Sequence, residues 1–159
     1  MPDQIGHYGQ IQFPATQVPS ANANNLDDYE EGPWTPALSF GGGTTDIAYH
    51  ATLNGGRYVK IGSQVTLTGI IYLANKGSSN GDALITGLPF ANGAGNANYC
   101  SPSLELSNIS FANQYKARIA PSAQTIALME VTEAGAATTL TDANFANDSW
   151  IAISATYFV

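Results

Sequence analysis

The sequence contains few charged residues and a single cysteine. Charged residues make up 11% of its 159 positions, whereas a typical soluble domain carries about 25%. Uncharged polar residues and glycine must therefore cover much of the surface, unless part of it is hidden in an oligomer. Because Cys100 is the only cysteine, no disulfide can form within the chain. We expect Cys100 to be a small buried apolar residue, since the sequence places no activating base beside it.

Basic residues are scarcer than acidic ones, and the net charge is -7. The basic positions are Arg57, Lys60, Lys76, Lys116 and Arg118, which are scattered along the sequence and form no stripe. Nucleic-acid phosphates and anionic membrane surfaces are both bound through clustered Lys and Arg. We therefore expect no nucleic-acid partner and no membrane partner.

Long apolar runs are also missing. The chain has no apolar stretch of about 18 residues, so we expect no transmembrane helix. Its first ten residues, MPDQIGHYGQ, contain neither the basic region nor the apolar region of a signal peptide. The sequence therefore predicts synthesis in a cytoplasm, and the place where the protein acts is a separate question.

Motifs that carry enzyme chemistry are absent from the sequence. There is no HExxH, GxSxG, P-loop or CxxC pattern, and His7 and His50 do not pair by sequence. We therefore expect a protein that is not an enzyme, with no catalytic residue, no cofactor and no bound metal. Two weaker alternatives remain. One is a pair of carboxylates that converge as in glycoside hydrolases. The other is an oxygen-ligand site between Asp142 and Asp148.

Residues 25–43, NLDDYEEGPWTPALSFGGG, mark the start of the expected domain. Prolines on both sides of Trp34 preset the backbone, and the large indole ring anchors it. The four carboxylates before Trp34 lack the spacing of a calcium loop, so we expect a solvated or partner-facing turn. Residues 1–33 combine prolines, an Asn/Ala/Ser stretch and these acids, and we interpret them as an extended arm. Residues 34–159 form the expected domain.

From Trp34 onward, short apolar stretches alternate with turn signals. Apolar residues alternate through 64–74, and a glycine pair at 55–56 predicts a hairpin between strands at 47–53 and 57–61. One helical turn is expected at Thr141–Phe145. Further strands are expected at 83–90, 99–106, 115–119, 125–132 and 150–159. This spacing predicts an all-β protein, an antiparallel β-sandwich or jelly-roll-like domain with an extended N-terminal arm.

The last strand, residues 150–159, is apolar on both faces. An antiparallel sheet normally exposes one face to solvent. The second apolar face therefore predicts a covering layer, supplied either by the same chain or by a neighbouring subunit. The second face of the strand at 64–74 is only weakly polar, which supports the same expectation.

Two short groups of residues have the chemistry of a glycan-binding surface. Sugars are bound by aromatic rings against their C–H faces and by planar polar side chains that fix their orientation. The candidate receptor-binding residues are Asn96, Asn98, Tyr99, Asn113, Gln114 and Tyr115. The alternative is that both tyrosines are ordinary aromatics at strand edges.

Four motifs, taken in order, resemble a known protein family. They are LDDYEEGPWTPALSFGG at 26–42, GRYVKIGSQVTLTGIIYL at 56–73, KGSSNGDALITGLPF at 76–90 and SWIAISATYFV at 149–159. With the lead-in FPATQVPSANANN at 13–25, this order resembles the C-terminal receptor-binding domain of bacteriophage tail fibre and tailspike proteins. The match is good over about residues 11–90, and it is loose between Ala91 and Asp148.

The resemblance implies a homotrimeric head at the tip of a virion tail fibre that binds a polysaccharide on the host-cell surface. On that basis the expected trimer interface includes Ile70, Tyr72, Ile151, Ile153 and Tyr157, and the arm contacts other tail proteins. The alternative is a structural virion module that serves trimerisation or fibre assembly without binding a receptor.

Overall fold

The computed structural model describes residues 9, 11–16, 18, 20–22 and 24–159. The remaining residues belong to the expected arm and lie outside the described part. Within the described residues the chain forms eleven strands, two short 3-10 turns and no α-helix. No helix among these residues is long and apolar enough to cross a membrane.

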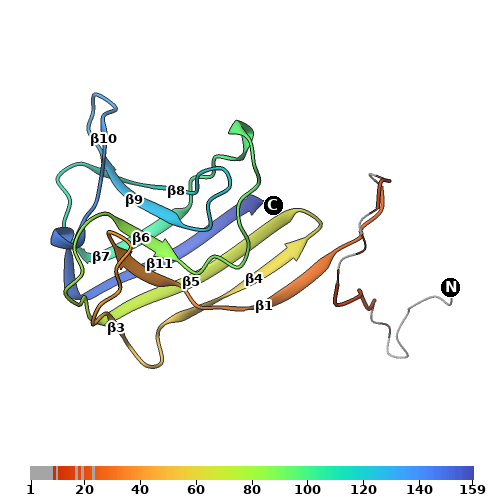
Figure 1. The fold of residues 1–159 in the computed structure, drawn as a ribbon, viewed down its shortest axis with the longest axis horizontal. Coiled ribbons are helices and arrows are strands. Elements are labelled where there is room, and N and C mark those ends of the chain that lie inside the picture. Colours follow the sequence, from red (N-terminus) through yellow and green to blue (C-terminus); the bar gives the residue numbers. More distant parts are fainter. Residues whose placement is uncertain (1–8, 10, 17, 19, 23) are drawn as a thin grey trace.

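The strands form two antiparallel sheets (Figure 1). The larger sheet contains β1 (Tyr29–Trp34), β3 (Ala48–Tyr49), β4 (Gly55–Ile61), β5 (Gln64–Asn75), β7 (Ser103–Ile109) and β11 (Phe145–Phe158). The smaller sheet contains β2 (Ala37–Phe40), β6 (Ala83–Thr86), β8 (Gln114–Arg118), β9 (Ile126–Val131) and β10 (Ala137–Thr139). The larger runs in the order β1-β4-β5-β11-β7 with β3 on β5, and the smaller in the order β10-β9-β6-β2 with β8 on β9. The prediction of an all-β protein with antiparallel sheets is confirmed.

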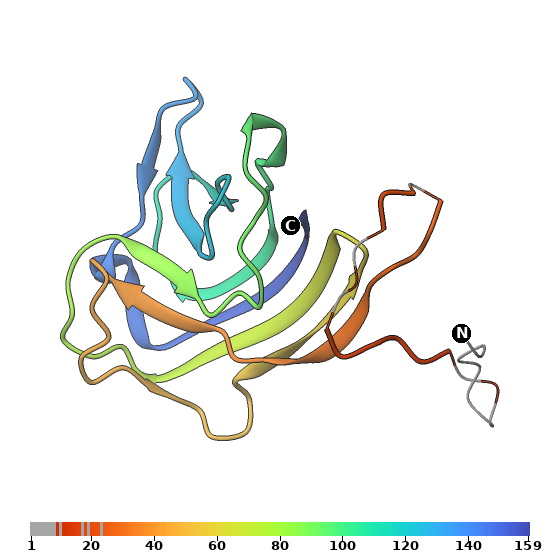
Figure 2. The same cartoon turned by 45° about the vertical axis from the view of Figure 1, so that its right-hand side comes forward.

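The core lies between the two sheets, and Figure 2 shows the long strands β5 and β11 curving under the shorter strands. Period-two alternation turns one side of each strand inward. The largest buried core side chains include Leu67, Ile71, Leu73, Ile151 and Tyr157 from the larger sheet and Leu38, Phe40, Ile85, Ile126 and Leu128 from the smaller. The Tyr157 hydroxyl donates to the Phe90 carbonyl at 3.0 Å, and burial raises the pKa of Tyr157 to about 12. The core is therefore closed within one chain.

The expected trimer interface is wrong for the residues on the inner face of β11. Ile151, Ile153 and Tyr157 are 0%, 3% and 1% exposed, because the smaller sheet of the same chain covers them. Ile70 and Tyr72 alternate with the buried positions of β5 and lie on the outer face of the larger sheet, where they are half-buried. The five residues expected in one interface therefore belong to two opposite faces. The covering layer predicted for the last strand is the chain's own second sheet.

Trp34 is buried in a slot in the larger sheet and is 5% exposed. Its indole N–H donates to the Thr68 carbonyl at 2.8 Å. Gly56 on β4 and Gly69 on β5 are direct partners across the sheet, and both leave room for the indole ring. The hairpin expected at the glycine pair is wrong, because β3 pairs with β5 rather than β4 and the glycines lie inside β4.

Among the carboxylates around β1, Asp28 is buried, whereas Glu30 and Glu31 are exposed as expected. Asp28 forms an ion pair with Lys60, and the two side chains are 11% and 7% exposed. Glu30 accepts a hydrogen bond from the Tyr58 hydroxyl, which raises the pKa of Tyr58 to about 12. Because β1 begins at Tyr29, the boundary expected after residue 33 falls inside this strand.

The helical turn expected at Thr141–Phe145 is present as the 3-10 turn Asp142–Asn144. Asn144 accepts a hydrogen bond from the Thr141 backbone N–H at 2.7 Å, and a reciprocal capping box closes the turn. The turn leads directly into β11 and so fixes where the last strand starts.

Candidate functional site

The loop before β7 carries the first group of predicted receptor-binding residues. Asn96 and Asn98 lie in the 3-10 turn Asn96–Asn98, which follows Gly95 at φ 98°. Buried Asn92 donates to the carbonyls of Asn98 and Ala120 and so ties this loop to the domain. The Asn98 amide donates to the Ala94 carbonyl at 2.7 Å. Its N–H group therefore holds the loop, and only Asn96 and Tyr99 present exposed side chains from this group.

Tyr99 is an exposed aromatic ring on a fixed backbone. It precedes Cys100, which bridges to Ile119 in antiparallel register through two backbone hydrogen bonds of 3.1 and 2.9 Å. Tyr99 as a whole residue is 56% exposed. The Arg118 guanidinium lies 5.8 Å from its centroid, within the range of a cation–π contact. Tyr99 is thus held from two sides and still presents more than half of its surface.

The second predicted group, Asn113, Gln114 and Tyr115, lies at the start of β8 and is exposed. The Tyr115 hydroxyl donates to the Leu104 carbonyl at 2.5 Å, and its ring meets Phe111 edge to face at 6.0 Å. Tyr115 therefore also joins β8 to β7. Tyr115 therefore has, in part, the structural role of an ordinary aromatic residue at a strand edge.

The two predicted groups lie near opposite ends of β8. Cys100 forms an isolated antiparallel bridge with Ile119 beyond the end of β8, and the Tyr115 hydroxyl near its start reaches the Leu104 carbonyl. Arg118 lies three positions after Tyr115 on β8, which corresponds to about 10 Å along the strand. The structure therefore does not bring all six predicted residues into one small site.

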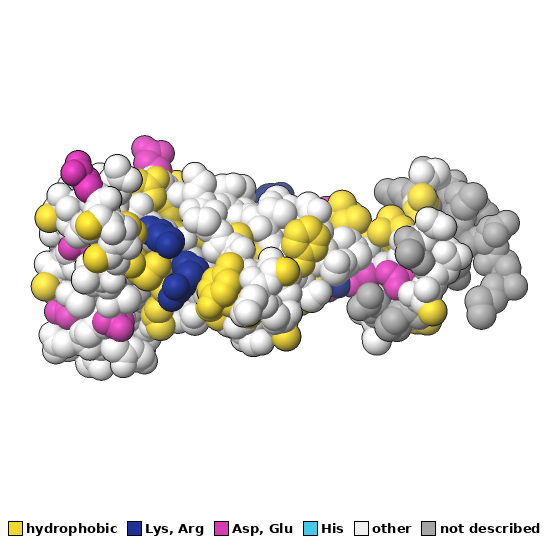
Figure 3. Space-filling model, turned by 90° about the horizontal axis from the view of Figure 1, so that it is seen from above, with side chains coloured by type: hydrophobic (Ala, Val, Ile, Leu, Met, Phe, Trp, Pro, Cys, Tyr) yellow, Lys and Arg dark blue, Asp and Glu magenta, His cyan; other side chains and the backbone are white. Residues whose placement is uncertain are grey.

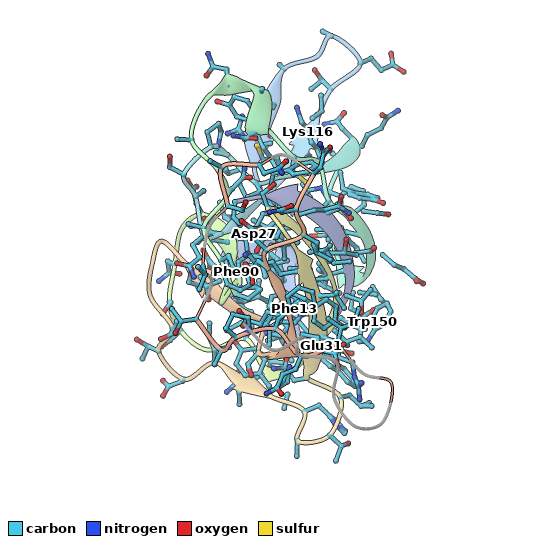
Figure 4. All side chains as sticks on the ribbon, turned by 90° about the vertical axis from the view of Figure 1, so that its right-hand side faces the viewer. Phe13, Asp27, Glu31, Phe90, Lys116 and Trp150 are labelled. Carbon is cyan, nitrogen blue, oxygen red and sulfur yellow. The ribbon has the colours of Figure 1, made fainter. Side chains whose placement is uncertain are left out.

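Between these two groups lie two cations that the sequence analysis treated as scattered. Lys116 and Arg118 are exposed on β8 and alternate with buried Ala117 and Ile119, so both project from the outer face. Figure 4 labels Lys116 in the upper part of the view, well above Trp150 and Glu31 of the larger sheet. The K-A-R-I alternation was the signal that could have revealed this pairing in the sequence.

A shallow hollow of about 290 Å³ adjoins Tyr99. It lies between the loop and the end of β11, and its lining includes Asn98, Tyr99, Thr156 and Phe158. Other hollows of similar depth occur elsewhere, including one of about 440 Å³ over β1 and β4 lined by Glu31, Pro33, Arg57 and Tyr58. The hollow at Tyr99 is the one that contains predicted receptor-binding residues.

Cys100 is half-buried rather than fully buried. Its thiol donates to the Thr156 carbonyl at 3.1 Å, and burial raises the pKa of the Cys100 thiol. A raised pKa keeps the sulfur protonated at neutral pH, which is the opposite of what an activated nucleophile requires. Cys100 therefore joins the loop to β11, in keeping with the structural role expected for it.

The acids considered as ligands or as a carboxylate pair are used separately. Asp142 accepts from the Gly81 N–H at 2.8 Å and lies 3.8 Å from the Lys76 ammonium. Asp148 accepts from the Asn108 side chain at 3.0 Å. Within the part of the chain that the structure describes, no three His, Cys, Asp or Glu side chains gather in a way that could hold a metal ion.

Comparison of the chain with models of protein families, with curated proteins and with solved structures finds no match.

Proposed function

We propose that this chain is the tip domain of a bacteriophage tail fibre or tailspike, and that it binds a host-cell polysaccharide without transforming it. The proposal rests on the ordered motifs at 26–42, 56–73, 76–90 and 149–159. These motifs contain all of β1, β2 and β6 and most of β4, β5 and β11. The family resemblance therefore concerns the strands that build the two sheets, and the loosely matching residues 91–148 contain the proposed binding surface. A jelly-roll-like head on a virion is the corresponding architecture.

The observation that carries receptor binding is the exposed, braced ring of Tyr99. An aromatic ring loses little conformational freedom on binding when its backbone is already fixed. The hollow beside it is lined by uncharged polar residues that include Asn98, Ser101 and Thr156. This combination of a rigid ring and planar polar groups suits the C–H face and hydroxyls of a sugar.

The outer face of the larger sheet is the surface we propose for assembly into a homotrimer. Tyr72 pairs directly with Trp150, and Ile70 pairs with Ala152, and all four are half-buried on this face. The His50 ring stacks on Tyr72 with a centroid distance of 5.2 Å. These four side chains form an apolar centre, with charged Glu105 next to Ala152 and Arg57 next to Thr68 at its margins. An apolar centre with a charged margin is suited to burial between subunits.

A structural virion module without receptor binding is the second candidate function. Ile11 and Val18 are 75% and 68% exposed in the N-terminal segment. Exposed apolar side chains ahead of a folded domain suit contact with another tail protein. The buried Asp28–Lys60 pair fixes the point at which this segment joins the larger sheet. On this hypothesis the N-terminal arm is the adhesive element and Tyr99 has no ligand.

The two functions are separated by staining a panel of bacteria with the full chain, labelled at its N-terminus, with its mass measured by light scattering on the same sample. A trimer that stains one host and is displaced by that host's soluble polysaccharide supports receptor binding. We expect Tyr99→Ala to weaken staining about tenfold, the effect of removing a central aromatic contact. The control is Leu53→Ala, which removes a 48% exposed side chain from a distant turn. Trimers that stain no host, or equal loss in both variants, would contradict the receptor proposal.

A second test concerns the assembly surface. We expect Trp150→Glu to convert trimer to folded monomer, because it places a charge on the apolar outer face of β11. Light scattering gives the mass, and far-UV circular dichroism shows whether the sheets remain. Thr138→Glu on exposed β10 is the matched control and should leave the mass unchanged. A folded Trp150→Glu trimer would exclude this face as the interface.

A further inference from the structure

Lys116 and Arg118 are two neighbouring cations on β8 in an otherwise acidic chain. The protein has five basic and twelve acidic residues. Lys60 and Lys76 lie within ion-pair distance of Asp28 and Asp142. Among the described residues, no carboxylate lies within that distance of Lys116 or Arg118. We call Lys116 and Arg118 the cationic pair.

Both flanks of the cationic pair are uncharged. On β9 the register partners of Lys116 and Arg118 are Met129 and Ala127. On the other side runs the segment 99–103, YCSPS, whose exposed side chains are a tyrosine and serines. Figure 3, seen from the side on which Figure 4 places Lys116, shows Lys and Arg side chains next to each other among hydrophobic and uncharged groups. The register partners of the cationic pair therefore supply no carboxylate to pair with either cation.

Two like charges at alternate positions on one strand face lie about 7 Å apart and repel each other. An anion placed between them would be attracted by both and would relieve that repulsion. The arginine fork matches the two oxygens of a carboxylate or phosphate, and the lysine supplies a point charge beside it. The cationic pair is therefore arranged to bind an anionic group, and a ligand has to supply that group.

The aromatic ring of Tyr99, next to the cationic pair, indicates what kind of anion the pair would bind. Tyr99 lies against Arg118 with more than half of the residue exposed. A ring suited to the C–H face of a sugar thus stands within one side-chain length of two cations. A simple inorganic anion would use the cations and leave the ring unused, whereas an acidic saccharide uses both.

We infer that Tyr99, Lys116 and Arg118 recognise an acidic sugar residue, one that bears a carboxylate or a phosphate group. The inference rests on the proposed polysaccharide binding and narrows its substrate class to anionic glycans. The net charge of -7 repels polyanions in general. Binding therefore depends on this one surface and discriminates against polyanions that offer charge without a sugar face.

The test measures binding of the full chain to immobilised polygalacturonate, a glycerol-phosphate polymer, dextran and a DNA duplex. We expect one of the two anionic polysaccharides to bind, and the carboxylate and phosphate arms identify the group. Dextran and DNA should bind at least tenfold more weakly. Arg118→Gln and Lys116→Gln should each weaken binding about tenfold, the usual effect of losing one charge-assisted hydrogen bond. Binding should also weaken as salt is raised.

Arg57→Gln is the matched control, because it removes the same charge from an exposed site on β4 of the other sheet. It should bind like the unmodified chain. Equal weakening by Arg57→Gln, or DNA binding as strong as that of the best polysaccharide, would reduce the effect to general charge attraction and overturn the inference. Dextran binding as strong as that of either anionic polymer would overturn it as well.

The same variants separate this inference from the proposed function. If the chain stains a host and Arg118→Gln and Lys116→Gln stain it equally well, the acidic-sugar inference fails while receptor binding stands. If the chain stains no host but binds polygalacturonate through Arg118, the acidic-sugar site is supported and the proposed host attachment fails.

Discussion

Replacing Lys60 with methionine is expected to lower the free energy of unfolding by about 3–5 kcal/mol. Lys60 pairs with Asp28 at the edge of the core, and the two side chains are only 7% and 11% exposed. Methionine fills a similar volume but leaves the Asp28 carboxylate buried without a counter-charge. The Lys60 ammonium also lies 5.6 Å from the Phe90 ring, a contact that methionine loses. Urea unfolding with an unchanged m value measures the effect.

The control for Lys60→Met is Lys76→Met. The Lys76 side chain is 30% exposed and lies 3.8 Å from Asp142, so its loss should cost no more than about 1 kcal/mol. A double variant with Lys60→Met and Asp28→Leu should recover most of the lost stability, because it removes the stranded charge. Equal destabilisation by the two single methionine variants would show that the Asp28–Lys60 pair is not effectively buried.

Replacing Trp34 with alanine is expected to cost about 3–5 kcal/mol, the range for emptying a buried aromatic site. The indole fills the slot above Gly56 and Gly69, and its N–H satisfies the Thr68 carbonyl. Gly69→Ala alone should also destabilise, by about 1–3 kcal/mol, because its new Cβ would lie 2.8 Å from the indole ring. In the Trp34→Ala background the same change should be nearly neutral. Urea unfolding of the four proteins in this cycle gives the coupling energy.

Gly56→Ala provides the contrast within the same slot. Its Cβ would lie 2.3 Å from the Thr68 backbone carbonyl as well as 2.1 Å from the indole nitrogen. Removing the ring relieves only one of these clashes, so Trp34→Ala should not rescue Gly56→Ala. If the costs of Trp34→Ala and Gly69→Ala simply add, the close packing of indole against this glycine does not exist in solution.

Several local features of the fold were predictable because they depend on neighbouring residues. The alternation of Val65, Leu67, Ile71 and Leu73 predicted β5 and its buried face. The 3-10 turn before β11 was predicted at Thr141–Phe145 and is present inside that range. β1 and β10 were not predicted. β1 contains Gly32 and Pro33, which are poor strand formers and are accommodated here at the edge of a sheet.

Strand pairing was less predictable, because it depends on residues far apart in the chain. The glycine pair at 55–56 has the local chemistry of a turn, yet Gly56 is needed where Trp34 approaches the sheet. Likewise the alternation in β11 identified two apolar faces but not what covers each of them. The covering of Ile151 and Ile153 comes from strands contributed by residues 37–40, 83–86 and 126–131.

The candidate site also combines features that are predictable from neighbouring residues with features that depend on distant ones. Tyr99 and Tyr115 were recognised from residue type alone, since exposed aromatics near amides are suited to sugars. Their separation depends on a long-range contact, the antiparallel bridge between Cys100 and Ile119. The cationic pair was overlooked because Lys116 and Arg118 acquire significance only when the other cations are placed. Two of those, Lys60 and Lys76, are neutralised by acids more than 30 positions away.

The sequence by itself determined the all-β class, the inward alternation of the long strands and the scarcity of positive charge. These properties follow from residue type and from the two-residue period of a strand, so they need no knowledge of distant contacts. The tertiary structure alone decided which face of β11 is buried and which carboxylate neutralises which cation. It also decided that Tyr99, Lys116 and Arg118 share one surface. Those outcomes depend on how segments widely separated in the chain meet, and the side-chain pattern of a single strand is the same whichever partner it finds.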